Sequence, residues 1–172
     1  MPKDARLALA ASLGSDVPFA LRGVYALGTG RGERLQPARL ARRFRAVVVM
    51  PRWTVSTPAA YAAIDRHKNI LTAWRATLRS AKLLGRNRIS VGRVMRLGNS
   101  FEEALGDRRS RFISLCARLR EAGTTEVRMT GSGSAVFGLL APGARAKDVV
   151  SRFEGNETLY IVSSAESGLR FV

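Results

Sequence analysis

The sequence is poor in the residues that build metal sites, disulfides and nucleophilic triads. It contains one cysteine, Cys116, and one histidine, His67, among 172 residues. A single cysteine excludes an intrachain disulfide. One cysteine and one histidine are also too few ligands for a structural zinc site. A Ser-His-Asp hydrolase would need His67 as its base, but the chain has no Gly-x-Ser-x-Gly motif. We therefore predict no metal site and no hydrolase of this kind.

Long hydrophobic runs are also absent. The stretch 135–140 is already interrupted by Gly138, and a membrane-spanning helix needs ~20 apolar residues. The first residues, Met-Pro-Lys-Asp-Ala-Arg, do not resemble a secretory signal peptide. Because 46% of the residues are hydrophobic and 24% are charged, the chain can still build a core. We expect a folded cytoplasmic protein without a membrane partner.

Acidic residues are scarce, and the excess of positive charge is concentrated in one part of the chain. There are 13 acidic and 29 basic residues, which gives a formal net charge of +16. Between Arg34 and Arg96 lie fifteen basic residues and a single acid, Asp65. Most of the basic residues are arginines, which suit bidentate contacts with phosphate. A polyanion or phosphorylated ligand would meet this segment, unless the charges only form a solvated face.

Hydrophobic periodicity and turn residues predict a mixture of helices and strands. Helices are expected at 4–13, 59–66, 70–84, 107–122 and 144–153. Strands are expected at 19–28, 46–50, 127–129, 135–140 and 159–163. Thr57 and Pro58 form a helix start, and Ser100 with Glu103 matches a capping box. In the helix at 107–122, Cys116 falls on the apolar face, which indicates a core role.

The glycine-containing stretches do not match the common phosphate-loop spacings. A Walker loop needs a Gly-Lys pair, and the chain has none. After Gly28-Thr-Gly30 a dinucleotide fingerprint would need a third glycine, where Glu33 stands instead. By spacing alone these stretches are turns.

Five short motifs, in order along the chain, resemble those of the diphosphocytidyl-methylerythritol kinases. That family lies in the superfamily of galactokinase, homoserine kinase, mevalonate kinase and phosphomevalonate kinase, the GHMP kinases. The resemblance extends from Leu7 to about Phe153. The motifs are Leu13-Gly-Ser-Asp-Val-Pro-Phe19, Gly28-Thr-Gly-Arg-Gly-Glu33, Ser56-Thr-Pro-Ala-Ala-Tyr61, Asn99-Ser-Phe-Glu102 and Met129-Thr-Gly-Ser-Gly-Ser-Ala-Val-Phe-Gly138.

The resemblance implies an α+β protein with a partial GHMP kinase fold. Residues 1–55 would be the remainder of the N-terminal lobe, and residues 56–172 a ferredoxin-like C-terminal domain, with the active site between them. The family's strand with a catalytic lysine and its Pro-x-Gly-Ala-Gly-Leu-Gly-Gly-Gly-Ser-Ser loop have no counterpart in these residues. We therefore expect a truncated chain that is inactive alone, whose N-terminal half could be a separate partner.

The resemblance also implies the reaction and the site residues. The family uses ATP with Mg²⁺ to phosphorylate the 2-hydroxyl of a small cytidine diphosphate substrate. Asp16 would take the proton from that hydroxyl, Tyr61 would stack on cytosine, and Thr57 and Arg22 would line the substrate side. Gly131, Ser132 and Gly133 would support the ATP phosphate loop from beneath.

Simpler structural roles remain open for the same residues. Asp16 could cap a turn, the loop at 130–134 could be a plain hairpin, and Tyr61 could belong to the core. The alternative is that the protein is a non-enzymatic basic module, which binds nucleic acid phosphates through the arginines between 34 and 96. Its aromatic residues, Trp53, Tyr61 and Trp74, are too sparse to indicate a base-stacking surface.

Overall fold

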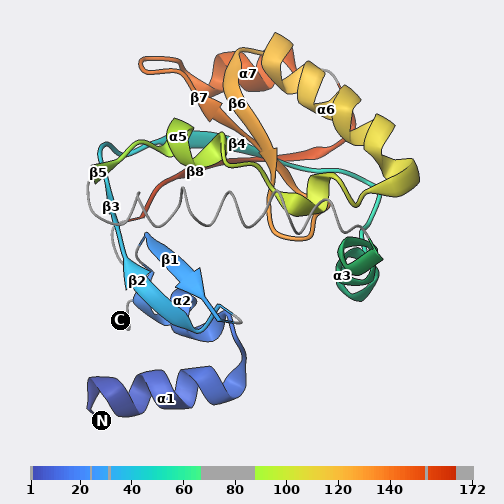
Figure 1. Ribbon diagram of the computed structural model, residues 1–172. Coiled ribbons are helices and arrows are strands. Elements are labelled where there is room, and N and C mark those ends of the chain that lie inside the picture. The colour runs from blue at the N-terminus through green and yellow to red at the C-terminus, as the bar shows by residue number, and fades with distance from the viewer. Residues whose placement is uncertain (1, 24, 31, 67–87, 154, 166–172) are drawn as a thin grey trace.

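The computed structural model describes residues 2–23, 25–30, 32–66, 88–153 and 155–165 (Figure 1). Helices α6 (Arg109–Glu121) and α7 (Ala146–Arg152) lie together on one side of the largest sheet, at the top of the view. The N-terminal elements gather on the opposite side, at the bottom of the view. This mixture of helices and antiparallel sheet confirms the α+β class.

Four antiparallel strands form the main sheet in the order β6-β7-β4-β8. The strands are β4 (Arg45–Met50), β6 (Thr124–Met129), β7 (Val136–Leu140) and β8 (Thr158–Ser163). In the central strand β4, Val47 lies opposite Gly138 of β7 and Ile161 of β8. A β-branched run suits this position because its side chains pack on both faces of the sheet. The strands predicted around 46–50, 127–129, 135–140 and 159–163 are confirmed.

The larger core lies between this sheet and helices α6 and α7. Val47 and Val49 of β4 are fully buried there, together with Leu119 of α6. The predicted apolar face of α6 is confirmed, although the turn before it, η2 (Gly106–Arg108), is a 3₁₀-helix. Burial raises the pKa of the Cys116 thiol to about 11, which confirms its core role and makes it a poor nucleophile.

The N-terminal part contains one helix that the sequence patterns did not predict. Helix α1 (Lys3–Leu13) is confirmed, but the strand expected at 19–28 is wrong. Instead α2 (Val17–Arg22) forms first, with Pro18 in its first turn and Gly23 in a left-handed conformation at its C-terminal end. Proline is favoured in the first turn of a helix, and glycine is favoured after the last. The strand β1 begins only afterwards, over Ala26–Thr29, and pairs with β2 (Arg34–Pro37).

Short elements cover the second face of the main sheet. β3 (Arg39–Leu40) pairs in parallel with β5 (Arg88–Ile89), and α5 (Val91–Met95) follows at once. Met95 is buried against Ala46 of β4 and Leu139 of β7. The segment after α5 therefore runs along the sheet towards the turn between β6 and β7.

Helix α3 (Thr57–Arg66) confirms the helix expected at 59–66 and begins at Thr57, followed by Pro58. The helix expected at 70–84 lies outside the described residues, as do His67 and Trp74. The domain boundary between residues 55 and 56 stays a prediction, and β4, which precedes it, shares a sheet with β6, β7 and β8. Among the described residues, no helix is long and apolar enough to span a membrane.

Candidate active site

The turn between β6 and β7 is a glycine loop at residues 130–134. Its backbone closes on itself, since the Thr130 amide donates to the Ala135 carbonyl at 2.9 Å and the Gly133 amide donates to the Thr130 carbonyl at 3.0 Å. Gly133 has φ +95°, and a Cβ built there would lie 2.7 Å from the Met129 sulfur. Any larger residue at 133 would therefore face both backbone strain and a steric clash.

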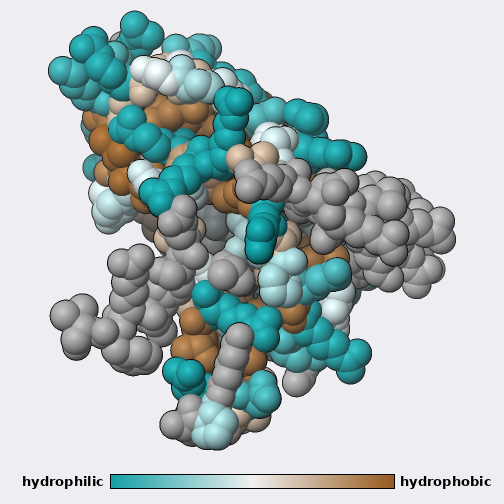
Figure 2. All heavy atoms as spheres, turned by 90° about the vertical axis from the view of Figure 1, so that its left-hand side faces the viewer, coloured by the Kyte–Doolittle hydropathy of each residue, from teal (hydrophilic) through white to brown (hydrophobic). Residues whose placement is uncertain are grey.

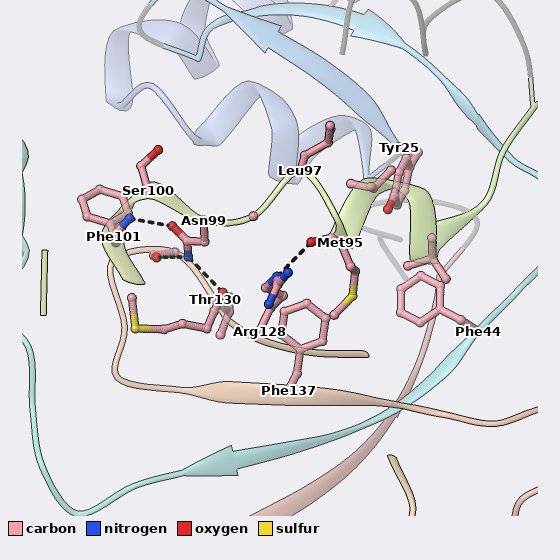
Figure 3. A pocket seen from close by; sticks show the side chains of 15 residues that line it. Tyr25, Phe44, Met95, Leu97, Asn99, Ser100, Phe101, Arg128, Thr130 and Phe137 are labelled. Atoms are coloured by element: carbon pink, nitrogen blue, oxygen red, sulfur yellow. Dashed lines mark hydrogen bonds between the residues drawn. The ribbon is translucent and has the colours of Figure 1, made fainter. Parts of the chain in front are cut away.

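Asn99 connects this loop by hydrogen bonds to the segment that follows α5. Its side-chain Nδ2 donates to the carbonyls of Met129 at 2.9 Å and Gly131 at 2.8 Å. Its Oδ1 accepts from the Phe101 amide at 3.0 Å and so caps the 3₁₀-helix η1 (Ser100–Glu102) (Figure 3). The Asn99 side chain thus caps a helix start and holds one carbonyl at the end of β6 and one in the loop.

The capping box predicted at Ser100 and Glu103 is wrong. The cap is Asn99, one residue earlier, and the Glu103 carboxylate instead accepts from Arg109 at 2.7 Å. The Asn99 side chain suits the cap because it offers an acceptor to the helix and a donor to the loop. The family motif at 99–102 contains this residue, but the sequence patterns gave it no role of its own.

Glu102 and Arg128 hold the strand that leads into the loop. The Glu102 Oε1 accepts from the Met129 amide at 2.9 Å, and Arg128 Nε donates to the Met95 carbonyl at 2.8 Å. Burial raises the pKa of Glu102, while the Met129 amide and the positive charge of Arg128 act in the opposite direction. These two largely buried polar side chains therefore hold the base of the loop in place.

Helix α3 meets the same loop from its other side. Thr57 Oγ1 and Ser132 Oγ lie 2.9 Å apart and share a hydrogen bond. One turn further along α3, the Tyr61 ring contacts Phe101 edge to face, with ring centroids 5.0 Å apart. Tyr61 is nevertheless 58% exposed, so it is not a core residue. The structure thus brings Thr57, Tyr61 and the glycine loop together.

A cavity of about 490 Å³ opens beside the loop, between the N-terminal part and the main sheet (Figure 3). Tyr25 comes from the N-terminal part, and burial raises the pKa of its hydroxyl. The cavity is of ordinary size for a ligand site, and aromatic and aliphatic side chains predominate in its wall. Its lining residues are Tyr25, Phe44, Val91, Val94, Met95, Leu97, Gly98, Asn99, Ser100, Phe101, Arg128, Met129, Thr130, Gly131 and Phe137.

This arrangement matches a known family of small-molecule kinases. A family model described as GHMP kinases C terminal matches residues 69–157, which is more than half of the chain. The chain belongs to the GHMP kinase family. The expected family resemblance is therefore confirmed.

Two relatives of this GHMP kinase chain share the same name. A 4-diphosphocytidyl-2-C-methyl-D-erythritol kinase from Pelotomaculum thermopropionicum is 35% identical over 156 residues, covering 90% of this chain and 53% of the relative. A protein of the same name from Clavibacter michiganensis is 50% identical over 66 residues, covering 38% of this chain and 21% of the relative. The chain thus spans about half the length of the first relative, and the 66-residue match to the second covers about a fifth of that relative.

Solved structures agree with this assignment. A crystal structure of 4-(cytidine 5'-diphospho)-2C-methyl-D-erythritol kinase is 30% identical, with a TM-score of 0.63. The match covers 92% of this chain and 56% of that one. A homoserine kinase from Cytophaga hutchinsonii is 14% identical with a TM-score of 0.57, which shows a shared fold alone. The GHMP kinase fold predicted from the motifs is confirmed.

Asp16 and Arg22 lie at the two ends of α2, in the N-terminal part of the chain. The Asp16 side chain is exposed, and a Cβ added to Gly32 would lie 3.9 Å from its Oδ1. Asp16 makes no capping hydrogen bond to α2, although it precedes that helix. Arg22 Nη1 donates to the Leu35 carbonyl of β2 at 3.4 Å. In the part of the chain that the structure describes, no hydrogen bond links either residue to Thr57, Tyr61 or the loop.

The described residues were compared with the side-chain clusters that bind metal ions. Among them, no group of three or more His, Cys, Asp or Glu side chains could hold a metal ion.

Proposed function

We propose that this chain carries the substrate side of a kinase that acts on 4-diphosphocytidyl-2-C-methyl-D-erythritol, the compound in the names of its relatives. The observation that carries the proposal is the 2.9 Å hydrogen bond between Thr57 and Ser132. It joins the helix that would hold the substrate to the loop that would lie beneath the ATP phosphates. A kinase needs these two groups side by side, because its chemistry depends on positioning the acceptor against the phosphoryl donor.

In the proposed reaction, Asp16 acts as the general base. The proton of the substrate 2-hydroxyl passes to the Asp16 carboxylate, and the hydroxyl oxygen forms a bond to the γ-phosphorus of ATP. The bond between that phosphorus and the bridging oxygen breaks, and ADP leaves. The exposed Asp16 carboxylate has no capping hydrogen bond that would have to be broken first, which supports this role.

The glycine loop supports a role next to phosphate. Among the described residues, none accepts a hydrogen bond from the amides of Gly131 and Ser132. Gly131 has φ +56°, a left-handed conformation that helps neighbouring amides point to one side. Successive free amides of this kind form anion-binding nests. Bound ATP would supply the transferred phosphoryl group, and these amides would orient it.

We further propose that these 172 residues alone do not turn over ATP. They contain no counterpart of the family's lysine or of its long glycine-rich phosphate loop. Charge stabilisation by such groups is usually the largest contribution to this kind of catalysis. In a coupled ADP-release assay with the cytidine diphosphate substrate, we expect only the background rate. Ordinary turnover that disappears in Asp16→Ala would overturn this prediction.

Substrate binding is expected to depend on the ring of Tyr61. Stacking on a base is worth about 1–3 kcal/mol, so Tyr61→Ala should weaken CDP binding by roughly 5-fold to 150-fold. Tyr61→Phe should retain the affinity, because the π face remains. The matched control is Tyr160→Ala, which removes a ring of similar exposure, 53% against 58%, from β8.

The measurement is a titration of CDP, UDP and a short single-stranded oligonucleotide at high and low salt. Attraction by the arginines is screened over a Debye length of ~8 Å near physiological ionic strength, whereas stacking persists at high salt. Equal losses for all three ligands in Tyr61→Ala would contradict a cytidine pocket.

A further inference from the structure

Two arginine-rich segments that are far apart in the sequence meet at one end of the molecule. The parallel pairing of β3 with β5 makes Arg39 and Arg88 direct Cα partners. Strand β4 starts nearby at Arg45, and α5 follows β5 and carries Arg93. In Figure 1 these elements lie at the left-hand end of the main sheet, and Figure 2, which looks onto that end, shows hydrophilic side chains protruding from it.

Four of the arginines at this end, Arg39, Arg42, Arg45 and Arg93, have no acidic partner among the described residues. All four are exposed. By contrast, Arg96 lies 3.6 Å from Glu126 and is partly neutralised. Unpaired positive charges at one end of a protein repel one another, so an anion bound here would relieve that repulsion.

We propose that this basic end, defined by Arg39, Arg42, Arg45 and Arg93, binds the phosphate backbone of double-stranded nucleic acid without reading its sequence. Arginines supply bidentate phosphate contacts, and several of them close together neutralise neighbouring phosphates and release counterions. This binding is separate from the proposed kinase function, because none of these arginines belongs to the group around the glycine loop.

The chemistry of the basic end favours a duplex over a membrane surface or a single strand. Membrane-surface binding strengthens when apolar side chains lie next to the cations, because they bury in the interface. The exposed large hydrophobic residues of the described chain fall outside 39–45 and 90–96, and the exposed Val162 of β8 lies opposite Ala46, next to Arg45. A single strand would need exposed aromatic rings for its bases. The aromatic residue within 39–45, Phe44, is half-buried and lines the cavity beside the loop, and the exposed ring of Tyr160 on β8 lies opposite Val48, three positions along β4 from Arg45.

The test compares two variants that remove the same charge from different places. The first is R39Q/R42Q/R45Q, in the basic end. The second is R108Q/R111Q/R120Q, which removes three exposed arginines at and next to α6, on the other side of the main sheet. Binding of each chain to a random-sequence DNA duplex is followed by fluorescence anisotropy between about 50 and 200 mM salt, a range typical for such measurements. Thermal melting by circular dichroism checks that both variants are folded.

The slope of log K against log salt should become shallower by about 2.7 in R39Q/R42Q/R45Q, at ~0.9 for each phosphate that the protein no longer neutralises. Its affinity at low salt should fall by about tenfold or more. The α6 variant should keep most of the slope and the affinity. CDP binding at high salt should be unchanged in both, so that failure of this inference is distinguishable from failure of the kinase proposal.

Three results would overturn the inference. Equal changes in the two variants would mean that net charge alone attracts DNA. Tighter binding to a single strand of the same length would mean that the basic end is not a duplex site. Loss of binding to phosphatidylserine vesicles in R39Q/R42Q/R45Q, with duplex binding intact, would show that a membrane surface is the true ligand.

Discussion

Asp16→Asn should lower kcat by about 10²–10⁴-fold in a kinase reconstituted from this chain and the N-terminal half of a full-length relative. The substitution keeps the size of the side chain but removes the carboxylate that would accept the proton of the substrate hydroxyl. Substrate binding should change little, so KM should stay within a few-fold of the original value. Initial rates of ADP release at several substrate concentrations separate the two constants.

The control for this experiment is Asp4→Asn. Asp4 is an exposed acid in the first turn of α1, so its replacement changes the net charge by the same amount. This variant should keep full turnover in the reconstituted enzyme. Full turnover in Asp16→Asn, or an equal loss in both variants, would show that Asp16 is not the catalytic base.

Asn99→Ala should lower the free energy of unfolding by about 3 kcal/mol. The side chain makes three hydrogen bonds to backbone groups, and a typical bond contributes about 1 kcal/mol. The carbonyls of Met129 and Gly131 would also be left without this partner. Urea unfolding measured by circular dichroism gives the change directly.

Two further variants sharpen the test of Asn99. Ser100→Ala removes a neighbouring hydroxyl for which no hydrogen bond is seen in the described structure, so it should change stability by less than about 0.5 kcal/mol. Asn99→Asp replaces the donor with a carboxylate that faces two carbonyl oxygens.

Only the protonated carboxyl of Asn99→Asp could donate to one of these carbonyls, so its pKa should be raised in the folded state. This variant should therefore be most stable at low pH and should lose stability as the pH rises above about 4.

A loss of unfolding free energy in Ser100→Ala equal to that in Asn99→Ala would contradict the role given to Asn99.

Several elements followed from the sequence because their signals are local. The helix at α6 has apolar residues at helical spacing, and the strand β4 is a β-branched run ended by Pro51. Helix α2 was missed because its six residues are too few to show a period. Its capping residues, Pro18 and Gly23, were the signal that could have identified it.

The candidate site was only partly predictable, because some of its contacts join residues that are far apart in the sequence. The family motifs marked Thr57, Tyr61 and the glycine loop, and the structure brings these together. The motifs did not reveal that Asn99 holds the loop, because its bonds reach residues 30 and 32 positions away. Nothing in the local sequence specifies a partner at that distance.

The sequence by itself determined the family, the α+β class and the uneven distribution of positive charge, since motifs, periodicity and composition are properties of neighbouring residues. Only the tertiary structure decided that Thr57 meets Ser132 across 75 positions, and that β3 and β5 join two arginine-rich segments into the basic end. The physical reason is that such contacts depend on how the elements pack. Packing follows from burial of the whole apolar surface, which no short segment specifies alone.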